Sequence, residues 1–160
     1  MSLTQLSDVL WRERNLLELL LFKLEEEQMI LTSGRSRWLG HATREVETVL
    51  DEIRGAELGR AVEADEVAHA LGLESGASLA QLADAAPAPW DELLRAHRDG
   101  FASLTAEISQ LADGNRELLA MSHRATQETL ASMHDVNTYD GYGRQAAPSR
   151  QTAQLVDRSF

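Results

Sequence analysis

The sequence predicts an all-α protein, an elongated antiparallel helical bundle or coiled coil of three long helices with a flexible C-terminal tail. Hydrophobic residues make up 43% of the chain and aromatic residues only 5%. Leu and Ala dominate the apolar residues of the sequence. Leu, Ala, Glu and Arg favour helix, whereas strands favour β-branched and aromatic residues. Only three prolines interrupt 160 residues, and apolar residues recur at helical spacing. We expect a helical bundle over residues 1–137 and a flexible tail over 138–160, where glycine, proline and polar residues show no periodicity.

The first helix is expected at residues 3–32. Leucines recur there at alternating three- and four-residue steps, with Glu13 and Glu27 in the two remaining slots. Such a heptad pattern is typical of a helix that packs against other helices along one seam. The leucines are Leu3, Leu6, Leu10, Leu17, Leu20, Leu24 and Leu31. The sequence Thr-Ser-Gly at 32–34 then supplies residues that end a helix.

The second helix is expected at residues 36–71, with Gly55 and Gly59 as weak points in its interior. Gly72, Gly76 and Pro87 interrupt residues 72–88, which we expect to form a connector. Within it, residues 78–83 are expected to form one or two helical turns.

The third helix is expected at residues 89–137. Its seam holds Leu94, Phe101 and Leu104 and continues to Leu118, with Asn115 in an inward slot. A polar residue in such a slot fixes the register of helix packing at some cost in stability. We expect Asn115 to fix the register and also to mark where the helix changes partner.

Beyond Asn115 the apolar residues thin out and spread over two faces. They are Leu118, Leu119, Met121, Ala125, Leu130, Met133 and Val136. One interpretation is a frayed end of the bundle. The other is a surface shared with the helix of a partner, for which methionine is well suited because its side chain adapts to irregular surfaces.

Composition and motifs argue against several classes of function. A net charge of −11 disfavours nucleic acid and anionic membranes as partners. No signal peptide and no membrane-spanning run is expected, so we expect a cytoplasmic protein. Glu66 and His69 have the E-x-x-H spacing of di-metal bundles, but no second such motif occurs. We expect no metal, no cofactor and no catalysis, and we expect His41 and His97 at helix edges. Residues 67–83 look like a helix-turn-helix, but residues 62–94 contain no Lys or Arg to contact DNA.

The C-terminal third resembles a known family. Residues 111–119, LADGNRELL, are similar to the L-x-x-x-N-x-x-L-L stretch of flagellar export chaperones of the FlgN type, the chaperones of hook–filament junction proteins. In that family the helix continues beyond this stretch and ends in a short segment of tyrosine and glycine, a place that residues 138–143, TYDGYG, fit. The long leucine-rich first helix agrees with the family, whereas the connector at 72–89 departs from its shorter members.

The resemblance implies a cytoplasmic type III export chaperone that is not an enzyme and uses no cofactor. Such chaperones bind the C-terminal helices of hook–filament junction proteins, prevent their premature assembly and deliver them to the export gate. Leu118, Leu119, Met121, Ala125, Leu130, Met133 and Val136 would bind the substrate protein, and Tyr139 and Tyr142 would dock on the gate protein. The alternative is a coiled-coil structural or adaptor protein that self-associates through the leucine seam of residues 3–31.

Overall fold

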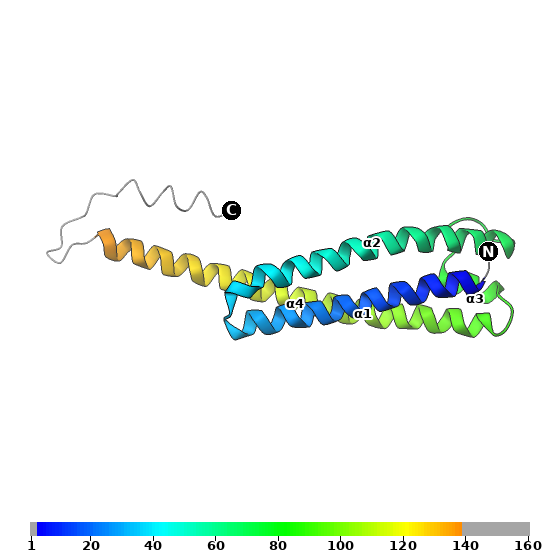
Figure 1. The fold of residues 1–160 in the computed structure, drawn as a ribbon, viewed down its shortest axis with the longest axis horizontal. Helices are drawn as coiled ribbons and strands as arrows, with labels where there is room; N and C mark the ends of the chain where they lie inside the picture. The colour runs from blue at the N-terminus through cyan, green and yellow to red at the C-terminus, as the bar shows by residue number, and fades with distance from the viewer. Residues whose placement is uncertain (1–2, 139–160) are drawn as a thin grey trace. The chain divides into compact units, whose positions relative to one another are not determined.

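The computed structural model describes residues 3–138, and every regular element within that range is a helix (Figure 1). The all-α prediction is therefore confirmed for the described residues. The elements are α1 (Leu3–Ser33), the 3₁₀ helix η1 (Ser36–Trp38), α2 (Leu39–Ala70), α3 (Leu79–Ala85) and α4 (Trp90–Thr138). Three helices are long, with 31, 32 and 49 residues, and α3 is an additional short helix within the expected connector.

The chain divides into two units at Leu118. The first comprises the residues up to Leu118, and the second begins at Leu119, within α4. Tyr139, Tyr142 and the rest of the expected tail lie outside the described residues. Within the described range, none of the helices has an apolar stretch long enough to cross a lipid bilayer.

In the first unit α1 and α2 lie side by side and run antiparallel (Figure 1). One core cluster joins residues of α3 to residues of α1, α2 and α4. Its fully buried leucines are Leu6, Leu10, Leu82 and Leu94. Ser78 starts α3 with a capping box, in which its hydroxyl accepts a hydrogen bond from the Gln81 backbone N–H. This cap satisfies backbone donors that would otherwise lack partners, so a helix of only seven residues can close that part of the core.

A second core cluster lies farther along α1 and α2. Its buried members are Leu20, Leu24, Val46, Val49 and Ile53. Residues of α4, among them Ile108 and Leu111, pack against it. Four leucines of the α1 seam, Leu6, Leu10, Leu20 and Leu24, are buried inside the first unit, and Leu3, Leu17 and Leu31 are half-buried.

Glu13 occupies one polar slot of this seam and is only 3% exposed. Its Oε2 lies 3.3 Å from Arg60 Nε of α2. The Arg60 guanidinium in turn lies 5.7 Å from the ring centre of Phe101 on α4. Burial raises the pKa of the Glu13 carboxyl, although the charge of Arg60 acts in the opposite direction.

His97 is buried, so the prediction that it lies at a helix edge is wrong. Its side chain is 2% exposed, and its Nε2 lies 3.4 Å from Ser7 Oγ of α1. The Trp11 ring meets the imidazole edge to face, with the ring centres 4.9 Å apart. Burial, and secondarily the charge of Arg14, lowers the pKa of His97. His97 follows Leu94 by three residues and precedes Phe101 by four, so its spacing already placed it on the inward seam.

We expect His97 to make the protein less stable as the pH falls below about 6.5. The unfolded chain takes up a proton near that ordinary histidine pKa, whereas the folded chain does so only at lower pH. Urea unfolding between pH 7 and 5 measures how steeply the free energy of unfolding falls with pH. His97→Gln should reduce this slope. His123→Gln, at an exposed position, serves as the control. An unchanged slope in His97→Gln would contradict the assignment.

Glu13 acts in the opposite sense at lower pH, since a raised pKa favours folding as the carboxyl protonates.

Candidate interaction surface on helix α4

Asn115 is 2% exposed, and within residues 3–136 it is the last buried residue of α4. Its Nδ2 donates to the Leu24 carbonyl oxygen at 2.9 Å and to Glu27 Oε1 at 3.1 Å. The other carboxylate oxygen of Glu27 accepts from Thr43 Oγ1 at 3.2 Å. One polar network therefore joins α4 to α1 and α2. A side chain that fixes helix register would make such contacts, and that role for Asn115 stays a prediction.

The exposure of α4 changes after Asn115. Leu118 and Leu119 are half-buried, and every position from 120 to 136 is exposed. The large apolar side chains there have exposed fractions of 63% for Met121, 56% for Leu130, 58% for Met133 and 70% for Val136. A helix that buried this stretch within its own fold would show a stripe of low exposure, so this segment presents apolar area to solvent.

The apolar side chains of this segment gather on one side of the helix. With 3.6 residues per turn, Leu119, Leu130 and Val136 project within about 60° of Met133, and Ala125 projects slightly farther round. Met121 lies off this side, on its flank. We refer to Leu119, Ala125, Leu130, Met133 and Val136 as the α4 apolar face.

Charged residues occupy the opposite side of the same segment. By the same geometry, Arg124, Glu128 and Asp135 project away from Met133, so the segment is amphipathic. Since the apolar face is exposed, the segment has the pattern of a helix that packs against another helix.

Two threonines extend the α4 apolar face, which sequence reasoning missed. Thr126 Oγ1 donates to the Ser122 carbonyl oxygen at 3.0 Å, and Thr129 Oγ1 donates to the Ala125 carbonyl oxygen at 2.9 Å. Because these hydroxyls are satisfied by the helix backbone, their methyl groups remain for apolar contact. These two threonines therefore interrupt the apolar face less than their polarity indicates.

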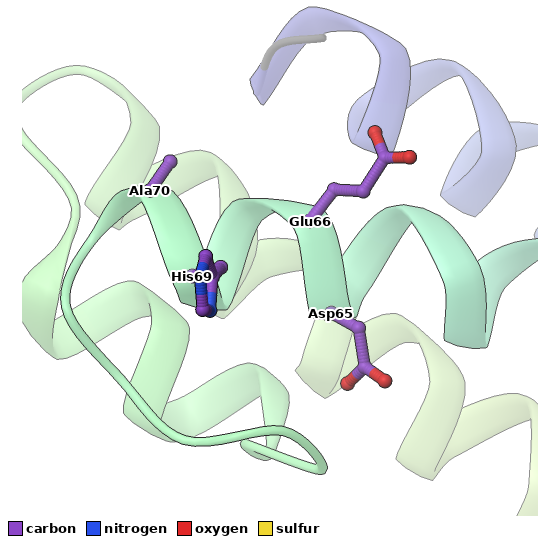
Figure 2. Close-up of a pocket in the computed structure, with 4 residues that line it drawn as sticks. All are labelled: Asp65, Glu66, His69 and Ala70. Atoms are coloured by element: carbon purple, nitrogen blue, oxygen red, sulfur yellow. The ribbon is translucent and has the colours of Figure 1, made fainter.

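The Glu66–His69 pair lies at an open pocket near the end of α2, lined by Asp65, Glu66, His69 and Ala70 (Figure 2). The Asp65 and Glu66 carboxylates point in different directions and do not converge on the imidazole. Asp65 Oδ1 instead accepts a hydrogen bond from the Gly76 backbone N–H at 2.9 Å. Across residues 3–138, no group of three or more His, Cys, Asp or Glu side chains is arranged to hold a metal ion.

Comparison with known proteins gives one family. The family model described as FlgN protein matches residues 1–150 of the chain. No significant match is found among curated proteins or among solved structures. The family match covers both the helices of the first unit and the α4 apolar face. The chain therefore belongs to the FlgN family of flagellar chaperones.

Proposed function

We propose that this protein is a cytoplasmic flagellar export chaperone whose α4 apolar face binds the C-terminal helices of hook–filament junction proteins. Binding would prevent the premature assembly of these clients, and the chaperone would then deliver them to the export gate. The observation that carries the proposal is the exposed apolar face of α4, where Leu130, Met133 and Val136 are all more than half exposed. Family membership supports a chaperone role in which such a face has a protein client.

The dimensions of the face suit a client helix. Residues 119–136 form a continuous helical segment, about 27 Å long at 1.5 Å per residue. An amphipathic helix of similar length could lie along it and bury its own apolar face. Meanwhile Met121 at the flank and Met133 at the centre have flexible side chains that could adapt to clients of different sequence.

The expected affinity follows from the area that such a complex buries. Burying apolar surface contributes about 25 cal/mol per Å², and the loss of translational and side-chain freedom offsets a large part of this. A face of five apolar residues with two threonine methyls therefore supports binding that masks the client and still allows release. No step in this mechanism requires a cofactor or a nucleotide.

The alternative, self-association through the α1 leucine seam, has less support. Leu6, Leu10, Leu20 and Leu24 are each at most 5% exposed within the first unit. A second copy could reach them only if α1 separated from α2 and α4. Among the described residues, the apolar surface of α4 beyond Leu118 is available without such unfolding.

Removing residues 119–160 tests the proposal. The truncated protein keeps both core clusters and should remain helical and folded, because all their members precede Leu119. It should lose binding to the purified C-terminal segments of the junction proteins from the same cell, as measured by isothermal titration calorimetry. A truncated protein that binds these segments as tightly as the full chain would refute the proposed surface.

Tyr139 and Tyr142 are proposed to dock on the export gate protein, a role that rests on the family resemblance. We expect Tyr139→Ala to leave client affinity unchanged and to weaken binding to the soluble domain of the gate protein about tenfold, as loss of an aromatic anchor does. Surface plasmon resonance with the client and the gate domain as separate analytes measures both. Tyr142→Ala should have the smaller effect, and unchanged gate binding in both variants would remove the assignment.

A further inference from the structure

The turn between α1 and α2 has a charge pattern that differs from the rest of the protein. The chain has 26 acidic and 15 basic residues, yet no Asp or Glu occurs between Glu27 and Glu45. Three arginines, one histidine and one tryptophan lie within this interval. We refer to Arg35, Arg37, Trp38, His41 and Arg44 as the Arg–Trp turn.

Side-chain contacts join most of these residues into one cluster. The Arg37 guanidinium lies 4.8 Å from the ring centre of Trp38, and the Trp38 and His41 ring centres are 5.8 Å apart. Arg44 Nη2 lies 3.0 Å from His41 Nδ1. The cluster is at the surface, since Trp38 is 44% exposed and the three arginines are exposed.

The arginines of this cluster are not used in ion pairs of the fold. Within residues 3–138, no carboxylate lies within salt-bridge distance of Arg35, Arg37 or Arg44. By contrast, Arg54 and Arg116 each pair with an aspartate three residues earlier. In a protein with an excess of carboxylates, three guanidinium groups without an ion pair, one of them over the exposed Trp38 indole, are available for a partner.

Local hydrogen bonds hold the turn in one conformation. The hydroxyls of Thr32 and Ser33 donate to carbonyl oxygens in the last turn of α1, and Ser33 Oγ accepts from the Arg35 backbone N–H. Gly34 has a φ of +71°, a conformation that other residues rarely adopt. The Trp38 backbone N–H then donates to the Arg35 carbonyl oxygen at 3.1 Å. An ordered surface loses less conformational entropy when a partner binds.

We propose that the Arg–Trp turn is a docking site for an acidic segment of a second protein, whose carboxylates pair with the arginines while an apolar side chain covers Trp38. Arginine and tryptophan are the residue types that most often dominate binding energy at protein interfaces. The site lies on the α1–α2 hairpin and shares no residue with the α4 apolar face, and this proposal does not rest on the proposed function.

The size of the cluster favours a protein over a lipid surface or a nucleic acid. Basic clusters that hold anionic lipids contain about four to eight cations, and DNA-binding proteins often make about six to ten phosphate contacts. This turn offers three arginines, and the net charge of −11 repels both kinds of polyanion. A short acidic peptide segment needs only two or three such contacts, and the Trp38 ring can then supply the apolar part of the interface.

The test uses the full-length protein and a short synthetic peptide of Glu, Asp and Leu as the probe. Proton–nitrogen NMR spectra show the indole N–H signals of the three tryptophans, and Trp38→Phe identifies that of Trp38. We expect the peptide to shift the Trp38 signal and to leave those of Trp11 and Trp90 in place. A matched peptide of Gln, Asn and Leu should shift none of them.

Charge-reversal variants show whether the arginines of the turn carry the binding. Arg35→Glu with Arg37→Glu should weaken peptide affinity at least about tenfold. Arg54→Glu with Arg116→Glu changes the net charge equally and should leave the affinity within about twofold, since each mutated side chain is exposed and remote in sequence from the turn.

Four results would overturn the proposal. Equal losses in the two double variants would show that only net charge matters. Tighter binding of phosphatidylglycerol vesicles than of the peptide would indicate a membrane surface, and tighter binding of a single-stranded oligonucleotide would indicate nucleic acid. Self-association that the Arg35→Glu, Arg37→Glu variant abolishes, measured by analytical ultracentrifugation, would indicate a second copy of the chain.

Discussion

Replacing Leu130 and Met133 together by aspartate is expected to weaken client binding at least about 100-fold, equivalent to about 2.7 kcal/mol. In the proposed complex both side chains are covered by the client helix, where an unpaired carboxylate costs several kcal/mol to desolvate. In the free protein they are 56% and 58% exposed, so the same change should alter the free energy of unfolding by no more than about 0.5 kcal/mol. Calorimetric titration with the client segment and urea unfolding measure the two effects.

The control places the same chemistry on another helix. Leu58 and Val62 of α2 are 73% and 59% exposed and lie one turn apart. Leu58→Asp with Val62→Asp adds the same two charges to exposed apolar helix positions outside α4, and should leave client affinity within about twofold. Equal loss in both double variants would show that added charge alone weakens binding, and the α4 apolar face would lose its support.

Helical spacing predicted which side of α1 is buried, including at polar positions. Glu13 and Glu27 were placed in the α1 seam by spacing, and both are at most 5% exposed. His97 was misplaced because its polarity was given more weight than its position between Leu94 and Phe101. Burial of His97 lowers its pKa, which favours the neutral imidazole, and the ring packs against Trp11. The expected turns at 78–83 were predicted without a cap, and the capping box of Ser78 and Gln81 is a further sequence signal for α3.

The two surfaces differ in how far the sequence could define them. Thinning of the seam after Asn115 left two interpretations open, a frayed bundle end or a surface shared with a partner helix, and positions 120 to 136 are exposed. The direction of the Thr126 and Thr129 hydroxyls could not be predicted, because a threonine can donate to the backbone or to solvent. Likewise the sequence shows the cations of the Arg–Trp turn but not that they lack carboxylate partners, since pairing depends on how distant helices pack.

Leucine truncations at two positions of α4 should separate stability from binding. Leu94 is fully buried in the core cluster with Leu6, Leu10 and Leu82, whereas Leu130 is 56% exposed. Leu94→Ala should lower the free energy of unfolding by about 2–5 kcal/mol, through lost apolar contact and the cavity left behind. Leu130→Ala, the same chemical change in the same helix, should cost no more than about 0.5 kcal/mol. Urea unfolding monitored by circular dichroism measures both.

Client binding should show the reverse order. Leu130→Ala should weaken affinity about tenfold, within the range for truncation of a contact residue in an interface. Leu94→Ala should retain wild-type affinity under conditions where the variant is still folded, because Leu94 belongs to the first unit and lies far along the chain from the α4 apolar face. If Leu130→Ala instead destabilised the protein as much as Leu94→Ala, the end of α4 would be packed within the free protein. The apolar surface that the client is proposed to cover would then not be available for binding.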